Sequence, residues 1–93
     1  MSGGHFEYYQ FKIGEIKEEV EKLISERKFS EKTINTFKQA AYHLEMAEIY
    51  TQRIDWLVSG DDSEEDFHEI LSKETFDVTI KHMFRDEVER GKI

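Results

Sequence analysis

The sequence predicts an all-α fold, a small helical bundle built on a long antiparallel helix pair with a C-terminal helix added. Three observations lead to this prediction. The chain of 93 residues contains no proline, so nothing forces a break within a long helix. Its apolar residues recur in steps of three and four, which is the spacing of a helix face. Capping residues stand where the helical segments are expected to begin and end.

The first helix is expected from about Phe6 to Arg27. Its apolar residues are separated by charged residues, so one side should be buried and the rest solvated. Residues 1–5 before the helix are expected to form a flexible tail. The predicted apolar stripe consists of Phe6, Tyr9, Ile13, Ile16, Val20 and Leu23.

The second helix is expected to follow Ser30, whose hydroxyl can accept a hydrogen bond from a first-turn amide, and to end at Ser59. Gly60 then supplies the left-handed residue that closes many helices. A helix of about 28 residues is about 42 Å long at 1.5 Å per residue. One short helix cannot cover that length, so its apolar surface predicts a third helix or a second copy of the chain packed against it.

A third helix is expected to start near residues 61–63, where every residue is a good N-cap. The path of residues 75–93 is less defined, because their apolar residues alternate like a strand and also step like a helix. Helix is favoured, since a lone strand would have no sheet to join. We expect one domain over residues 1–93. The narrow apolar stripe of the third helix consists of Phe67, Ile70 and Leu71.

Composition excludes several classes of function. The chain has no cysteine, which removes disulfides and thiolate chemistry and fits a reducing compartment. Its net charge is −8, with eleven acidic and five basic residues in 61–93, so direct binding of nucleic acid is not expected. The apolar runs are too short for a signal peptide or a membrane span. We therefore expect a cytoplasmic protein without a membrane partner.

Two groups of residues contain the parts of a pocket for a small anion. Backbone amides near a helix start can bind anions, arginine can grip a phosphate, and aromatic rings can stack on a base. The alternative is that the glycines are an ordinary chain terminus, that Arg53 pairs with an acid such as Asp55, and that Trp56 is part of the core. The candidate ligand-binding residues are Gly3, Gly4, His5, Tyr8, Tyr9, Arg53 and Trp56.

An acidic run offers a second kind of site. It could imitate the phosphates of a nucleic acid and dock on a basic surface of another protein. The alternative is a capped and solvated helix start, because acids in a first turn suit the helix dipole. The candidate partner-binding residues are Asp61, Asp62, Glu64 and Glu65.

Catalytic and metal motifs are not recognised. His43 and His82 lie in helical stretches without a serine or cysteine nucleophile in a suitable setting. Glu65 and His68 have the Glu-x-x-His spacing of di-iron bundles, but those bundles use two such motifs. We therefore expect a binding protein and not an enzyme, with no cofactor and no metal.

The segments MSGGHFEYYQ and YTQRIDWLVSGDDSEEDFHE resemble a group of short proteins of tailed bacteriophages and prophages. The resemblance covers about residues 1–72. It implies a phage accessory factor that acts in the host cytoplasm on host physiology or defence. Combined with the candidate residues, it leads us to expect a homo-oligomer that sequesters a small nucleotide-like signal in pockets between copies, as counter-defence. The alternative is an acidic inhibitor or nucleic-acid mimic that binds a host defence protein.

Overall fold

The computed structural model describes residues 4–85. It contains the three helices α1 (Gln10–Glu26), α2 (Glu31–Val58) and α3 (Glu64–Met83). No strand is formed in this part of the chain, so the all-helical prediction is confirmed, and α3 includes residues 75–83. The predictions for residues 1–3 and 86–93 lie outside the described residues.

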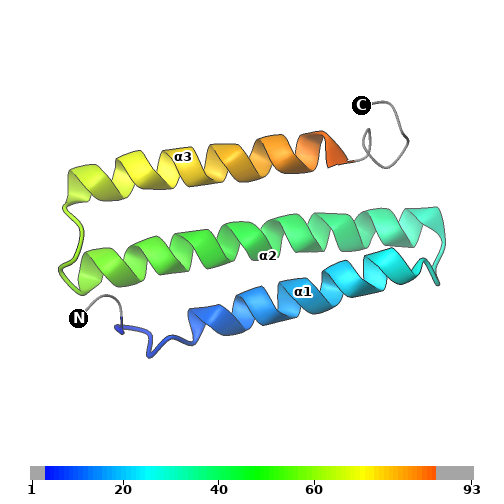
Figure 1. Cartoon of the computed structure of the whole chain (residues 1–93), viewed down its shortest axis with the longest axis horizontal. Helices are drawn as coiled ribbons and strands as arrows, with labels where there is room; N and C mark the ends of the chain where they lie inside the picture. Colours follow the sequence, from blue (N-terminus) through cyan, green and yellow to red (C-terminus); the bar gives the residue numbers. More distant parts are fainter. Residues whose placement is uncertain (1–3, 86–93) are drawn as a thin grey trace.

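The three helices lie side by side in one layer, with α2 in the middle (Figure 1). Successive helices run antiparallel, and α1 and α3 pack on opposite sides of α2. The structure measures 45 × 26 × 16 Å, and its shortest dimension is close to the diameter of a single helix with its side chains, about 10–12 Å. Two broad faces of the layer are therefore open to their surroundings.

Serine side chains cap the two longer helices. The hydroxyl of Ser30 accepts a hydrogen bond from the backbone N–H of Thr33 at 3.3 Å, and that of Ser63 accepts one from Asp66 at 3.1 Å. Each bond satisfies an amide that has no partner within its own helix. Ser30 is the cap that the sequence predicts, and Ser63 is the cap used among the candidates at 61–63.

The end of α2 is closed by the glycine that the sequence indicates. Gly60 has φ +86°, and its N–H donates to the carbonyl oxygen of Leu57 at 3.1 Å. The N–H of Asp61 donates to the carbonyl of Trp56 at 2.9 Å. This pair of bonds is the Schellman arrangement, which satisfies the last carbonyls of a helix and reverses the chain.

The start of α1 differs from its prediction. The helix begins at Gln10 and not at Phe6, because the backbone before it turns repeatedly. Its buried face also differs, since Gln10 and Ile24 are the buried residues of α1, whereas Ile16 and Leu23 of the predicted stripe are exposed. The apolar surface of α1 is thus wider than the strip that α2 covers.

The buried apolar core is small and belongs mainly to α1 and α2. Ile24, Ile34 and Ala41 form it, with Val20 and Phe37 packed against them. Several large apolar residues remain exposed in the single chain, which leaves self-association a reasonable prediction. They are Tyr8, Tyr9, Phe11, Ile16, Leu23, Phe29, Tyr50, Val58, Phe76, Met83 and Phe84.

Candidate functional site

The N-terminal turn segment, residues 4–9, folds back on itself before α1 begins. The N–H of Glu7 donates to the carbonyl of Gly4, and that of Tyr9 donates to the carbonyl of Phe6, both at 3.1 Å. Gly4, Glu7 and Tyr8 all have positive φ, at +102°, +57° and +65°. A left-handed conformation costs an L-residue about 1–2 kcal/mol, so other contacts must hold this segment in place.

The carboxylate of Asp55 supplies those contacts from α2. Its Oδ2 accepts the N–H of Gly4 at 3.0 Å, and its Oδ1 accepts the N–H groups of His5 at 2.6 Å and Phe6 at 3.2 Å. Three successive amides that converge on one carboxylate form an anion-binding nest. Asp55 itself is fully buried, at 0% exposure.

A glutamine pair completes the surroundings of this carboxylate. Gln10, the first residue of α1, donates from Nε2 to Oδ2 of Asp55 at 3.1 Å and to Oε1 of Gln52 at 2.8 Å. Burial by itself raises the pKa of Asp55, but the N–H groups of Gly4, Phe6 and His5 and the amide of Gln10 lower that pKa more. The carboxylate is therefore held in its charged form.

The N-terminal turn segment and the first turn of α1 display aromatic side chains toward solvent. Tyr9 is 67% exposed, and Tyr8 and Phe11 are also exposed. The rings of Tyr8 and Phe11 are stacked, with centroids 6.1 Å apart and planes 9° from parallel. Beside them is an open groove of about 340 Å³ lined by His5, Phe6, Glu7 and Tyr9. Exposed rings on a fixed backbone suit the binding of a flat aromatic group.

Arg53 is buried on the opposite side of α2. It is 4% exposed, its guanidinium carbon lies 4.0 Å from the ring centroid of Trp56, and its Nη1 donates to Oδ2 of Asp62 at 3.5 Å. Its Nε lies 3.3 Å from Oε1 of Glu74 on α3, yet makes no hydrogen bond within the described residues. The guanidinium is thus neutralised by two carboxylates but loosely hydrogen-bonded.

The candidate ligand-binding residues consequently fall into two groups within one chain. Gly4, His5, Tyr8 and Tyr9 lie where residues 4–9 meet α2 on its α1 side, and Arg53 with Trp56 lies on its α3 side. The amides of Gly4 and His5, in the segment expected to be a flexible tail, bind Asp55. Gly3 lies outside the described residues.

The candidate partner-binding acids differ in their environment. Asp61, Glu64 and Glu65 are exposed, whereas Asp62 is partly buried and pairs with Arg53. The first turn of α3 contains Glu64 and Glu65, where negative charge is stabilised by the helix dipole. Three of the four side chains therefore lie on the surface, and the fourth has a role inside the fold.

Gln10, which binds Asp55, and Gln52, which binds Gln10, are residues of this site that the sequence did not predict. A signal for Gln10 was present, because it precedes Ile13 by three residues and so falls on an apolar helix face, where a polar residue needs a partner. Gln52 carried no such signal. Its contact depends on the path of residues about forty positions earlier.

Among residues 4–85, no group of three or more acidic or histidine side chains could hold a metal ion. None of the helices formed by these residues is long and apolar enough to span a bilayer. Comparison with known proteins found no family model, no curated protein and no solved structure that matches this chain.

Proposed function

We propose that this chain is a small binding protein that captures an anionic, nucleotide-like ligand between copies of itself. The observation that carries the proposal is the display of Tyr8 and Tyr9 on a segment that a buried carboxylate holds in place, next to the exposed Phe11 in the first turn of α1. Two adjacent L-residues with positive φ are tolerated only where surrounding contacts enforce them. Such strain next to exposed rings is typical of a binding surface and unnecessary for a mere chain terminus.

A second copy is part of the proposal because one chain separates the two halves of the pocket. The aromatic segment 4–9 lies on one side of α2 and Arg53 on the other. The exposed apolar residues on α1 give a second copy a surface to bury. A neighbour could then bring its own Arg53 and Trp56, or its own aromatic segment, toward the ligand.

The chemistry of the proposed ligand follows from these groups. Tyr8 and Tyr9 would stack on a base, as aromatic side chains do in sites for single-stranded nucleic acids. Arg53 is buried and paired with Asp62 and Glu74, so it would bind a phosphate by exchanging these carboxylates for the ligand. The length of its bond to Asp62 and the absence of a hydrogen bond from its Nε within residues 4–85 favour such an exchange. Together with the resemblance to phage proteins, this favours sequestration of a host nucleotide signal in the cytoplasm, a counter-defence role without catalysis.

Native mass spectrometry of freshly purified protein gives the first test, because it reports the copy number and any small molecule that remains bound. Calorimetry with a cyclic dinucleotide and with ADP-ribose then measures binding directly. We expect Tyr9→Ala to weaken binding about tenfold, the loss of one base-stacking contact. Phe76→Ala is the matched control, because Phe76 on α3 is similarly exposed, at 63%. A monomer that binds neither probe contradicts the proposal.

A second candidate function rests on the acidic end of α3. Residues 61–77 contain eight acidic residues and one basic residue, Lys73, and Asp61, Glu64 and Glu65 are exposed. This surface would suit an inhibitor that docks on a basic patch of a host protein. Salt-sensitive capture of a host protein that is lost on Glu64→Lys and Glu65→Lys substitution would support it. Salt-insensitive capture, or capture that survives the two substitutions, would count against it.

A further inference from the structure

Residues 75–85, the C-terminal half of α3 and the two residues after it, expose three large apolar side chains, Phe76, Met83 and Phe84. Val78 is the only buried apolar residue of α3, and the core residues Ile24, Ile34 and Ala41 all belong to α1 and α2. Most of the stabilisation of a helix in a protein comes from packing of its apolar face. With Val78 as its single buried apolar side chain, this half of α3 also depends on polar contacts to stay docked.

Its own sequence is also a weak helix former. Thr75, Val78, Thr79 and Ile80 are β-branched, and such residues lose side-chain freedom in a helix. Thr75 and Thr79 donate their hydroxyl hydrogens to backbone carbonyls one turn earlier, at 2.8 and 2.9 Å, a bond that competes with helix geometry. Residues 75–85, whose apolar pattern also fits a strand, thus depend on tertiary contacts to stay helical.

Tyr42 of α2 contacts this segment, with its hydroxyl 3.3 Å from that of Thr79 and its ring centroid 5.3 Å from that of His82. Ionic contacts add a further attachment. Glu45 of α2 accepts hydrogen bonds from Lys81 at 2.7 Å and lies 3.2 Å from Nε2 of His82, both on α3. Lys17 of α1 lies 3.9 Å from the same carboxylate. These four residues, the Glu45 cluster, connect all three helices. Burial raises the pKa of Glu45, but the bonds from Lys81 and His82 and the charge of Lys17 lower it more.

One further pair ties the chain just after α3 to α1. Arg85 donates from Nη1 and Nη2 to the two carboxylate oxygens of Glu21 at 2.8 and 3.1 Å. These links span a groove of about 440 Å³ whose lining includes Lys17, Phe84 and Arg85. Between α2 and α3 lies another groove of about 450 Å³. Apart from Val78 and the contacts of Tyr42, the end of α3 is therefore joined to its neighbours by charged side chains that border open grooves.

The opposite half of α3 is anchored differently. Arg53 reaches Glu74 from α2, and it also pairs with Asp62 in the turn before α3. The acidic half of α3 thus faces a buried cation of α2, and the basic half faces the anion Glu45. Complementary charges of this kind fix the direction and register of a helix.

We propose that residues 75–85 form a strap that opens from α1 and α2 as a separate unit, and that the Glu45 cluster keeps the strap closed. Opening leaves the first half of α3 attached through Arg53. This inference goes beyond the proposed function and does not depend on it. Charged groups face Glu45 from both neighbouring helices, Lys17 from α1 and Lys81 with His82 from α3, so loss of its charge removes several contacts together.

Amide hydrogen exchange of the full chain, followed by mass spectrometry, tests the strap. In the wild type at 50 mM NaCl we expect residues 75–85 to exchange faster than α2, because local opening needs less free energy than global unfolding. Glu45→Gln should accelerate exchange of residues 75–85 roughly tenfold, the effect of losing a partly buried ionic contact. Exchange in α1 and α2 should change little. Raising NaCl to 500 mM should accelerate hydrogen exchange of residues 75–85 more in the wild type than in the variant.

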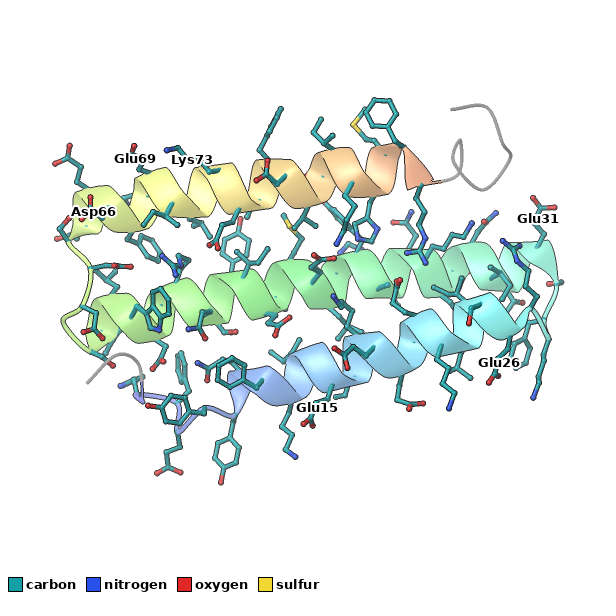
Figure 2. The ribbon with its side chains drawn as sticks, viewed as in Figure 1. Glu15, Glu26, Glu31, Asp66, Glu69 and Lys73 are labelled. Carbon is teal, nitrogen blue, oxygen red and sulfur yellow. The ribbon has the colours of Figure 1, made fainter. Side chains whose placement is uncertain are left out.

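The matched control is Glu69→Gln. Glu69 lies on the outer edge of α3 beside Lys73 (Figure 2), in an exposed pair at 3.5 Å, and this variant should exchange like the wild type. If Glu45→Gln does not fold, Lys81→Gln removes a single contact of the Glu45 cluster and should accelerate hydrogen exchange of residues 75–85 about threefold. Equal exchange rates for residues 75–85 and α2 in the wild type would overturn the proposal. So would equal acceleration of all three helices in the folded variant.

Discussion

Arg53 and Asp55 stand two residues apart on α2, are both buried, and serve opposite sides of the helix. Asp55 accepts the amides of residues 4–6 and the side chain of Gln10, whereas Arg53 pairs with Asp62 and Glu74. Two positions on a helix differ by about 200° in direction, so the pair can bind the N-terminal segment and α3 at the same level of α2. This short stretch of α2 therefore holds both the N-terminal turn segment and α3 in place.

Asp55→Asn should release the N-terminal turn segment. The substituted amide lacks the charge that three N–H groups share, and its own N–H₂ would point at donors. We expect the amides of His5 and Phe6 to lose at least about tenfold of their protection against hydrogen exchange. The α2–α3 turn should keep its protection. Unchanged exchange at residues 4–6 would show that Asp55 does not hold this segment.

The same contact predicts an acid sensitivity. Because the folded-state pKa of Asp55 is lowered from its ordinary value of 3.8, its contribution to stability is complete above the unfolded-state value and declines as the pH falls through the folded-state value. The difference in melting temperature between wild type and Asp55→Asn should therefore be constant from pH 5 upward and shrink toward pH 2. A difference that grows in acid would contradict this sign.

Arg53→Met should destabilise the fold by about 2 kcal/mol. The change leaves two carboxylates without their cation, which costs about 3–5 kcal/mol for a fully buried pair. The cost is smaller here because the side chain of Glu74 is 43% exposed and can be solvated. Urea unfolding followed by the fluorescence of Trp56, the single tryptophan, measures the effect. Lys73→Met is the control, since exposed helix pairs contribute about 0.5 kcal/mol or less. Equal loss in both variants would argue against a structural role for Arg53.

Tyr9→Ala should leave stability within about 0.5 kcal/mol of the wild type, because substitutions of exposed residues away from special contacts are mild. Ile34→Ala removes a side chain that is 1% exposed and should cost about 2–5 kcal/mol. Denaturant midpoints compare the two variants. Marked destabilisation by Tyr9→Ala would mean that the ring supports the fold, and the assignment of this segment to ligand binding would lose its basis.

Gly14→Ala tests the close passage of α1 beside α2. Alanine is favoured over glycine within a helix by about 0.8–1 kcal/mol. A Cβ at this position would, however, contact the carboxylate of Glu48, whose Cδ would be 2.9 Å away. We expect a nearly neutral single variant, since Glu48 can turn aside, and a net gain of up to about 1 kcal/mol in Gly14→Ala with Glu48→Ala. Destabilisation of the double variant relative to Glu48→Ala alone would show that backbone, and not Glu48, limits the approach.

The helices could be predicted from local signals, but the beginning of α1 could not. The cap formed by the hydroxyl of Ser30 and the left-handed turn at Gly60 each involve residues only a few positions apart. A short stretch of sequence is therefore enough to predict them. The left-handed backbone of Glu7 and Tyr8 depends on a carboxylate about fifty positions away. Neither residue type prefers that conformation, and no local pattern announces it.

The candidate site shows the same limit. The chemistry of the residue types predicts Arg53 and the residues around Gly4 as parts of a site, and both groups make long-range contacts of the fold. Their distribution on two sides of α2 follows from the docking of α1 and α3, which the spacing does not contain. The sequence suggests Asp55 only as a partner for Arg53, whereas the structure places it against the backbone amides of residues 4–6, whose position no sequence pattern indicates.

The central place of α2 also constrains how this protein can evolve. Since α1 and α3 each pack on their own side of α2, amino-acid substitutions in one outer helix leave most contacts of the other unchanged. Related chains should then show covariation between α2 and each neighbour, and little between the outer helices. Glu21 and Arg85, joined across the layer, are where changes in α1 and α3 would have to be matched.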